Sequence, residues 1–136
     1  MKKKIYFLCT GNSCRSQMAE GYGHLLLPAE EVEIRSAGIE THGLNPRAVA
    51  VMLEDGVDIR QQTSDLIDPN YFANADLIVT LCGDAKDKCP VIPQSATHLH
   101  WDLQDPARVT GSEETIMEAF RETRDTIKAL VAGLKD

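Results

Sequence analysis

The sequence lacks long apolar runs and is short of basic residues. No stretch approaches the roughly 18 consecutive apolar residues that a membrane-spanning helix needs, so we expect no membrane partner or membrane-embedded segment. Only 14 Lys and Arg stand against 21 Asp and Glu, which gives the 136-residue chain a formal net charge of −7. That acidity is unfavourable for a nucleic-acid binder. The hydrophobic share of 43% is that of a folded globular domain, so a disordered chain is also excluded.

A recognisable export signal is missing as well. The basic start Lys2-Lys3-Lys4 precedes only a short apolar run, which continues into polar residues 10–13 and not into a small-residue cleavage site. We therefore predict a cytoplasmic protein. Residues 1–15 contain four basic side chains and no acidic one, so an anionic substrate would be attracted to this part of an otherwise acidic chain.

Four cysteines are present, but neither common structural use fits them well. The spacings Cys9-x4-Cys14 and Cys82-x6-Cys89 lack zinc-knuckle pairs, and a chain of this size without an export signal has little need of a disulfide framework. In a reducing compartment such thiols point to catalysis or redox chemistry. The alternative is that they are four small, buried apolar side chains.

No repeat, low-complexity tract or linker divides the chain, which indicates one domain over residues 1–136. Hydrophobic patterning predicts strands at residues 4–9, 32–36, 76–82 and, more weakly, 97–101, and helices at residues 16–27, 46–56 and from 112 onward. Asn45 and Pro46 give the second helix an N-cap and a proline at its first position. Strands that alternate with helices imply an α/β fold, with a parallel sheet covered by helices on both faces.

The segment Cys9-Thr10-Gly11-Asn12-Ser13-Cys14-Arg15-Ser16 joins the first predicted strand to the first predicted helix. A loop that leads into a helix N-terminus points successive backbone N–H groups at one spot and adds the positive end of the helix dipole, so it can hold a tetrahedral oxyanion. The candidate substrate-binding residues are Thr10, Gly11, Asn12, Ser13, Cys14 and Arg15.

Side chains of the same segment carry the predicted chemistry. Gly11 and Asn12 tolerate the left-handed dihedrals that a tight loop needs, and Arg15 can clamp two oxyanion oxygens with its planar fork. The field that holds an anion also stabilises a thiolate, which makes Cys9 the candidate nucleophile, and Ser16 can donate a hydrogen bond to it. The alternative is a strand-to-turn junction with a buried cysteine, a surface arginine and no chemistry.

This segment resembles the phosphate-binding loop of the low-molecular-weight protein tyrosine phosphatases and of the arsenate reductases that share their fold. The resemblance continues through residues 36–43, 63–68, 80–82 and 105–106, and thus covers nearly the whole chain. In detail the chain resembles the thioredoxin-coupled arsenate reductases. The resemblance implies a central four-stranded parallel sheet flanked by helices.

Two features favour the reductases over the phosphatases. The phosphatases follow their Asp-Pro with tyrosines that line a cleft for an aryl phosphate, whereas Asp105-Pro106 is followed here by Ala107-Arg108-Val109. The reductases carry two further redox cysteines, which Cys82 and Cys89 match. A phosphatase acting on phosphotyrosine or a small phosphoester, and a non-enzymatic thiol redox sensor, remain the alternative functions.

The resemblance implies a three-cysteine relay for the reduction of arsenate to arsenite, as a detoxification reaction. Cys9 attacks arsenic while Asp105 protonates the departing oxygen, Cys82 then attacks the sulfur of Cys9, and Cys89 resolves the resulting disulfide. Thioredoxin reduces the final Cys82–Cys89 disulfide. We expect a monomer with no tightly bound cofactor. Without the resemblance, the alternative for Asp105 is an ordinary residue at the start of a turn before Pro106. The alternative for Cys82 is a buried strand residue with no redox role.

Other polar residues have weaker predicted roles. Cys14 is expected to be structural, with adventitious oxidation to a Cys9–Cys14 disulfide as the alternative, and His98, His100 and Trp101 are expected to be fold or rim residues. Four further residues match a monovalent-cation site of some relatives, although they also read as loop-bracing polar groups, and Gln62 beside them lies where relatives vary. These four are Asn12, Glu20, Ser36 and Asp65.

Residues 83–88 are compatible with a short helix that Pro90 helps to end. On an intact helix the Cα atoms of Cys82 and Cys89 would lie about 10 Å apart, whereas a disulfide tolerates at most about 7 Å. We therefore predict a conformational switch in residues 83–93, in which the segment unwinds and loops outward on oxidation. The alternative is a permanently irregular loop that already holds both thiols close.

Overall fold

The computed structural model describes residues 2–81 and 92–135, and it contains a four-stranded, all-parallel sheet with the strand order β2-β1-β3-β4. The strands are β1 (Lys3–Cys9), β2 (Val32–Gly38), β3 (Leu77–Thr80) and β4 (Thr97–His100). The predicted fold class and the number of strands are therefore confirmed. Cys82, Cys89 and the predicted helix at residues 83–88 lie outside the described residues.

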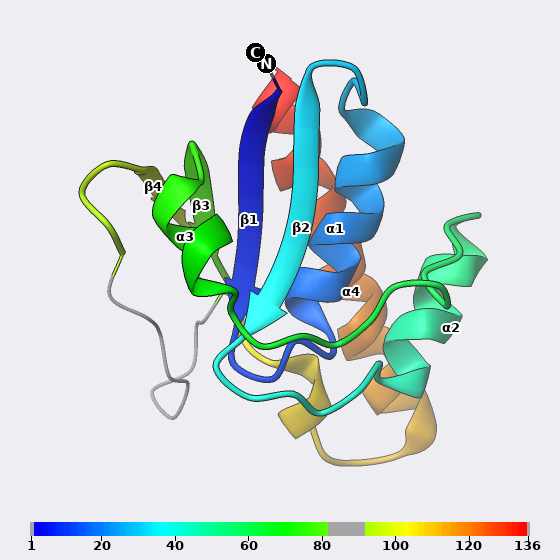
Figure 1. Ribbon diagram of the computed structural model, residues 1–136. Helices are drawn as coiled ribbons and strands as arrows, with labels where there is room; N and C mark the ends of the chain where they lie inside the picture. The colour runs from blue at the N-terminus through cyan, green and yellow to red at the C-terminus, as the bar shows by residue number, and fades with distance from the viewer. Residues whose placement is uncertain (1, 82–91, 136) are drawn as a thin grey trace.

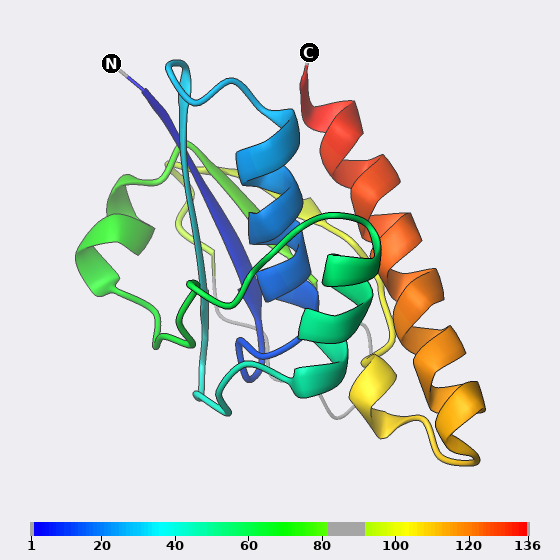
Figure 2. The ribbon, with the colours of Figure 1, turned by 90° about the vertical axis from the view of Figure 1, so that its right-hand side faces the viewer.

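Helices cover both faces of this sheet. Three of them, α1 (Arg15–Leu26), α2 (Pro46–Glu54) and α4 (Glu113–Ala132), lie on one side, and the short α3 (Pro69–Asn74) lies on the other (Figures 1 and 2). Two 3-10 turns, η1 (Pro106–Arg108) and η2 (Gly133–Lys135), flank α4 in the sequence. Across the described part of the chain, no helix is long and apolar enough to cross a membrane.

The central strand β1 explains why its sequence is a nearly continuous apolar run. Ile5 and Phe7 pack into the core under α1, α2 and α4, while Tyr6 and Leu8 pack into a second core on the side of α3. A parallel strand with both faces covered buries every side chain, so it shows no alternation of polar and apolar residues. In the second core the rings of Tyr6 and Tyr71 meet edge to face, with centroids 4.7 Å apart.

The predicted helix start at Asn45-Pro46 is confirmed, and an Asp-Pro pair starts two further turns in the same way. The Asn45 side chain accepts from the backbone N–H of Arg47 at 2.8 Å and caps α2. Asp68 precedes Pro69 in the same way and caps α3, which sequence patterning did not predict because six residues are too few to show a helical period. Asp105 likewise caps η1 before Pro106.

All four strands end on the same edge of the sheet, and the residues predicted to react follow those ends. Cys9 is the last residue of β1 and is paired with Gly38 at the end of β2. Asp105 follows β4 by five residues and begins η1 at this edge (Figure 1). A ligand site at the carboxyl ends of parallel strands is the expected location in an open α/β sheet.

Candidate functional site

Residues 9–15 wrap around a small cavity between the end of β1 and the start of α1. The cavity has a volume of about 50 Å³ and is lined by the loop together with three side chains from elsewhere, those of His42, Asp105 and Arg108. This space is large enough for an inorganic oxyanion. The start of α1 adds N–H groups and the positive end of its dipole.

The Cys9 thiol lies in this cavity wall beside a hydroxyl. Cys9 Sγ is 2.9 Å from Ser16 Oγ, and both residues are buried. A hydroxyl at that distance can donate to a thiolate and so stabilise the reactive form of the sulfur. The predicted pair of nucleophile and hydrogen-bond donor is thus brought together.

Asn12 braces the loop from the inside. Its φ of 49° is left-handed, as expected for a non-glycine residue in a tight loop, and its side chain is fully buried. The amide nitrogen Nδ2 donates to Ser16 Oγ at 2.7 Å and to Ser36 Oγ at 3.0 Å, while Oδ1 accepts from the Asp65 N–H at 2.7 Å. Asn12 therefore ties the end of β2 and the segment before α3 to the hydroxyl that contacts Cys9.

A second brace was not foreseen. Gln17 is completely buried in the first turn of α1, and its Nε2 donates to the backbone oxygens of Asn12 at 3.0 Å and Thr63 at 2.8 Å. Gln62 in turn donates to Gln17 Oε1 at 2.8 Å. A glutamine in a helix normally reads as a surface residue, and nothing in the sequence pattern distinguishes this one.

Two glycines allow the chain to pass closely at the loop. A Cβ on Gly38 would lie 2.6 Å from Thr10 O and 2.8 Å from Asn12 N, both backbone atoms. A Cβ on Gly11 would lie 2.4 Å from Nδ1 of the His42 ring. The expectation that Gly11 supplies a left-handed turn is wrong, because its φ is not positive; the His42 imidazole instead packs directly against it.

The close approach of the loop backbone to Gly38 gives a first prediction. We expect Gly38→Ala to destabilise the protein by about 1–3 kcal/mol and to lower activity, because neither backbone neighbour can move away as a side chain could. Denaturant unfolding and an activity assay measure both effects. Gly133→Ala is the matched control, since nothing lies within 4 Å of its added Cβ and we expect a change of about 0.5 kcal/mol or less. Equal stability of the two variants would show that this approach is not tight.

Arg15 and Asp105 meet at the cavity. Arg15 is 2% exposed, and its Nη1 donates to the Leu103 backbone oxygen at 2.9 Å, while Nη2 lies 3.8 Å from Asp105 Oδ2. The other Asp105 oxygen, Oδ1, accepts from the Ala107 N–H at 3.0 Å as the cap of η1. The alternative of a surface arginine is therefore wrong, and a carboxyl group stands beside the predicted anion clamp.

Cys14, the second cysteine of the loop, has a different environment. It is 3% exposed, its Sγ lies 3.7 Å from Ser13 Oγ, and burial raises the pKa of its thiol to about 12. A thiol with such a pKa is protonated at physiological pH and is a poor nucleophile. This environment agrees with the structural role predicted for Cys14.

The remaining predicted fold residues gather on the edge strand. Thr80 Oγ1 lies 3.0 Å from His98 Nε2 and 2.7 Å from His100 Nδ1, so the two imidazoles satisfy a buried hydroxyl. Trp101 packs against the Phe7 ring at a centroid distance of 5.9 Å. Both contacts are those of residues that hold the fold together. Within residues 2–81 and 92–135, no cluster of three or more His, Cys, Asp or Glu side chains suits a metal ion.

The four residues matched to a monovalent-cation site lie together. The Ser36 hydroxyl donates to Glu20 Oε1 at 2.5 Å and accepts from Asn12, whose Oδ1 faces the Asp65 backbone. Glu20, Ser36 and Asp65 also line one groove of about 800 Å³ beside α1. Hard cations prefer oxygen ligands of this kind, so the bound monovalent cation stays a prediction. The hydrogen bonds among these residues brace the loop in any case.

Three comparisons bear on this site. The family described as low molecular weight phosphotyrosine protein phosphatase matches residues 4–136. The arsenate reductase of Bacillus licheniformis is 57% identical over 126 residues, which cover 93% of this chain and 90% of that protein. The arsenate reductase of Bacillus subtilis strain 168 is 58% identical over 125 residues, covering 92% and 89%. A solved structure described as an arsenate reductase in the phosphate binding state superposes with a TM-score of 0.79 at 36% identity, covering 97% and 95%.

Proposed function

Because the chain belongs to the low molecular weight phosphotyrosine protein phosphatase family and is an arsenate reductase, we propose that Cys9 is the nucleophile of a three-cysteine relay regenerated by thioredoxin. The substrate is arsenate, and the reaction belongs to arsenic detoxification. The family relationship predicted from the loop is confirmed by the match over residues 4–136. The geometry of the site supports the roles of Cys9, Arg15 and Asp105, whereas those of Cys82 and Cys89, which lie outside the described residues, rest on the family resemblance.

One observation supports this proposal above the others: a thiol, a guanidinium and a carboxyl group line the same small cavity at a helix N-terminus. Cys9, Arg15 and Asp105 come from the ends of β1, the start of α1 and the segment after β4. Arsenate bound to the loop amides and to Arg15 would place arsenic next to Cys9 Sγ and one oxygen next to Asp105. This is the arrangement that displacement of an oxygen by sulfur requires.

The chemistry balances in two thiol steps. The Cys9 thiolate forms a bond to arsenic, and one arsenate oxygen leaves as water with a proton from Asp105. The Cys82 thiolate then attacks the Cys9 sulfur, and the electron pair of the sulfur–arsenic bond remains on arsenic. Arsenic(V) thereby becomes arsenic(III), arsenite is released, and the two thiols become a Cys9–Cys82 disulfide.

Regeneration requires two further exchanges. Cys89 attacks Cys82 and frees the Cys9 thiolate, and a thioredoxin dithiol reduces the Cys82–Cys89 disulfide. All electrons come from thiols, so we propose that the reaction needs no tightly bound cofactor. We also propose that the protein works as a monomer. A monovalent cation beside Glu20 and Ser36 would act by bracing Asn12, not by entering the reaction.

Thioredoxin-coupled turnover tests the relay. With thioredoxin, thioredoxin reductase and NADPH, we expect arsenate-dependent NADPH consumption by the native protein and at most a single turnover by Cys89→Ser. Peptide mass mapping of the stalled variant should find the Cys9–Cys82 disulfide. Sustained turnover by Cys89→Ser would exclude the relay. Hydrolysis of phosphate esters without arsenate reduction would favour the phosphatase function instead.

A further inference from the structure

The cavity holds a second arginine that the proposed reaction does not use. Arg108 lies at the end of η1 and lines the cavity together with residues of the loop. Its Nε is 3.9 Å from Asp105 Oδ2, the same oxygen that lies 3.8 Å from Arg15 Nη2. Asp105 therefore stands between two guanidinium groups.

The two arginines differ in burial. The Arg15 side chain is 3% exposed and is anchored to the Leu103 backbone, whereas the Arg108 side chain is 41% exposed. A guanidinium half in solvent loses little in changing partner, because its ion pairs are weak and water remains available to it. Arg15 is thus a buried part of the cavity wall, whereas the Arg108 side chain is partly accessible to solvent and to an incoming anion.

The turn that carries Arg108 is itself held firmly. Asp105 caps it through the Ala107 N–H at 3.0 Å, and the Arg108 N–H donates to the Asp105 backbone oxygen at 3.1 Å. Pro106, buried at the first position of the turn, fixes the backbone between them. The backbone therefore keeps the Arg108 side chain over the cavity while its terminal group can change partner.

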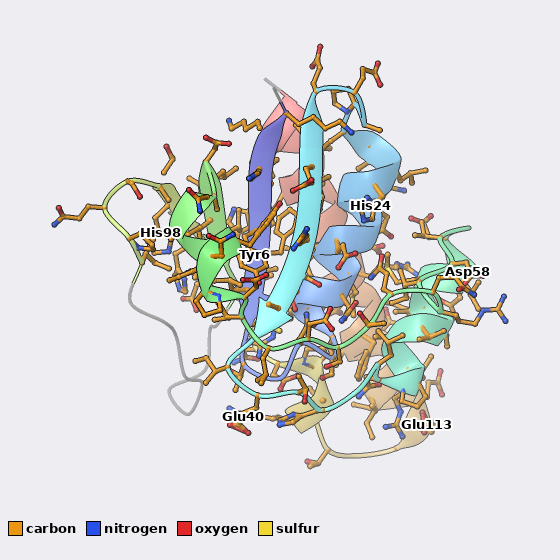
Figure 3. All side chains as sticks on the ribbon, viewed as in Figure 1. Tyr6, His24, Glu40, Asp58, His98 and Glu113 are labelled. Carbon is orange, nitrogen blue, oxygen red and sulfur yellow. The ribbon has the colours of Figure 1, made fainter. Side chains whose placement is uncertain are left out.

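The surroundings of the cavity are acidic, which makes a second cation there useful for binding an anion. The chain has a net charge of −7, and both Asp105 and Glu40 lie close to the cavity, Glu40 within 3.2 Å of His42 and at the carboxyl end of β2 (Figure 3). Arg15 and the N-terminus of α1 attract a doubly charged oxyanion inside the cavity, but the surrounding carboxylates oppose its approach, and a second cation in the cavity wall reduces that opposition. Arg108 is a half-exposed cation at that position.

We propose that Arg108 is a substrate-binding residue that recruits arsenate by exchanging its contact with Asp105 for a contact with the incoming oxyanion. The exchange leaves the Asp105 carboxyl group facing the oxygen that will depart. It also places the anion between Arg15 below and Arg108 above, so that the planar forks of both can hold its oxygens. The proposal rests on the proposed function, in which this cavity binds arsenate.

Alkylation of Cys9 tests binding without turnover when the probe is inorganic phosphate, which has the shape and charge of arsenate but is not reduced by thiols. Phosphate in the cavity should protect Cys9 of the native protein from iodoacetamide, and the concentration dependence of protection, followed by peptide mass mapping, gives a dissociation constant. We expect Arg108→Gln to weaken that constant about tenfold, as the loss of one partly exposed charged contact implies. Lack of protection in the native protein would contradict the proposed function itself, whereas equal protection in Arg108→Gln would overturn only the role of Arg108.

Steady-state kinetics separates recruitment from a structural effect. In Arg108→Gln the KM for arsenate should rise about tenfold with little change in kcat, and added salt should lower kcat/KM less steeply than in the native protein. Arg108→Lys keeps the charge but loses the planar fork, so it should recover part of the loss. Arg47→Gln is the matched control, because Arg47 is also 41% exposed and ion-paired, to Glu113, but lies outside the cavity lining. A fall in kcat at unchanged KM, or an Arg108→Lys variant no better than Arg108→Gln, would overturn the proposal.

Discussion

Replacing Cys9 with serine is expected to lower arsenate turnover at least about a thousandfold while leaving the domain folded. Cys9 is the cysteine at the end of β1 that contacts the Ser16 hydroxyl, and its sulfur faces the cavity that the anion would occupy. A serine oxygen fits the same space, but its hydroxyl is far less acidic than a thiol and cannot form the disulfide that carries electrons away. Arsenite production and circular dichroism measure activity and folding separately.

Cys14→Ser is the control for this experiment. Cys14 belongs to the same loop and is as deeply buried as Cys9, but burial raises its pKa to about 12. Because the thiol form persists throughout the physiological range, Cys14 supplies no thiolate to arsenate, and we expect its variant to keep most of the activity. Near-normal arsenite production by a folded Cys9→Ser protein, or equal losses in the two variants, would contradict the assignment of Cys9.

The pKa of Cys14 also makes a labelling experiment informative. Its thiol should remain unmodified by iodoacetamide at pH 7 and pH 9 and should become reactive only as the pH approaches about 12, because the thiolate is the reacting species. Protein digested after labelling at pH 7 should therefore carry the label on Cys9 and not on Cys14. This separates the two loop cysteines without any substitution.

The sheet and the reactive loop were predictable because their signals are local. The apolar run of β1, the Asn45-Pro46 start of α2 and the Cys-x5-Arg-Ser spacing each depend on neighbours in the sequence, and all three lie where they were expected. α3 was missed although Asp68-Pro69 carries the same start signal as Asn45-Pro46, because a six-residue helix offers no hydrophobic period.

The parts that could not be predicted depend on distant contacts. Gln17 bridges Asn12 and Thr63, which lies 46 residues away, and Gly11 is in contact with a histidine that comes from the segment after β2. Neither partnership leaves a trace in the local pattern. The position of Arg108 beside Asp105 could be predicted only in part. The sequence shows that the two residues are three positions apart. It does not show that both line the cavity of Cys9, which depends on the ends of the parallel strands meeting at one edge of the sheet.

Asp105→Asn is expected to slow the chemical step by about 10²–10⁴-fold while keeping anion binding, because a positioned proton donor contributes that much to a transition state. An asparagine retains the Oδ1 acceptor that caps the Ala107 N–H, so η1 should keep its geometry. It removes a negative charge near Arg15 and Arg108 and thus takes away a competitor of the anion for both guanidinium groups. We therefore expect inorganic phosphate to protect Cys9 from alkylation at least as well as in the native protein, while kcat for arsenate falls.

The neighbouring Asp102→Asn provides the control, because Asp102 is an exposed carboxylate of the same segment that does not line the cavity. Its variant should match the native protein in both binding and turnover, which shows that loss of one charge from this acidic chain is not itself the cause. A loss of protection by phosphate in Asp105→Asn with kcat preserved would assign Asp105 to binding and not to proton transfer. Rapid-quench measurement of the first turnover identifies the step that the substitution slows. Loss of a proton donor to the departing oxygen must slow formation of the sulfur–arsenic adduct. It should not slow the later disulfide exchanges, because no oxygen leaves in them.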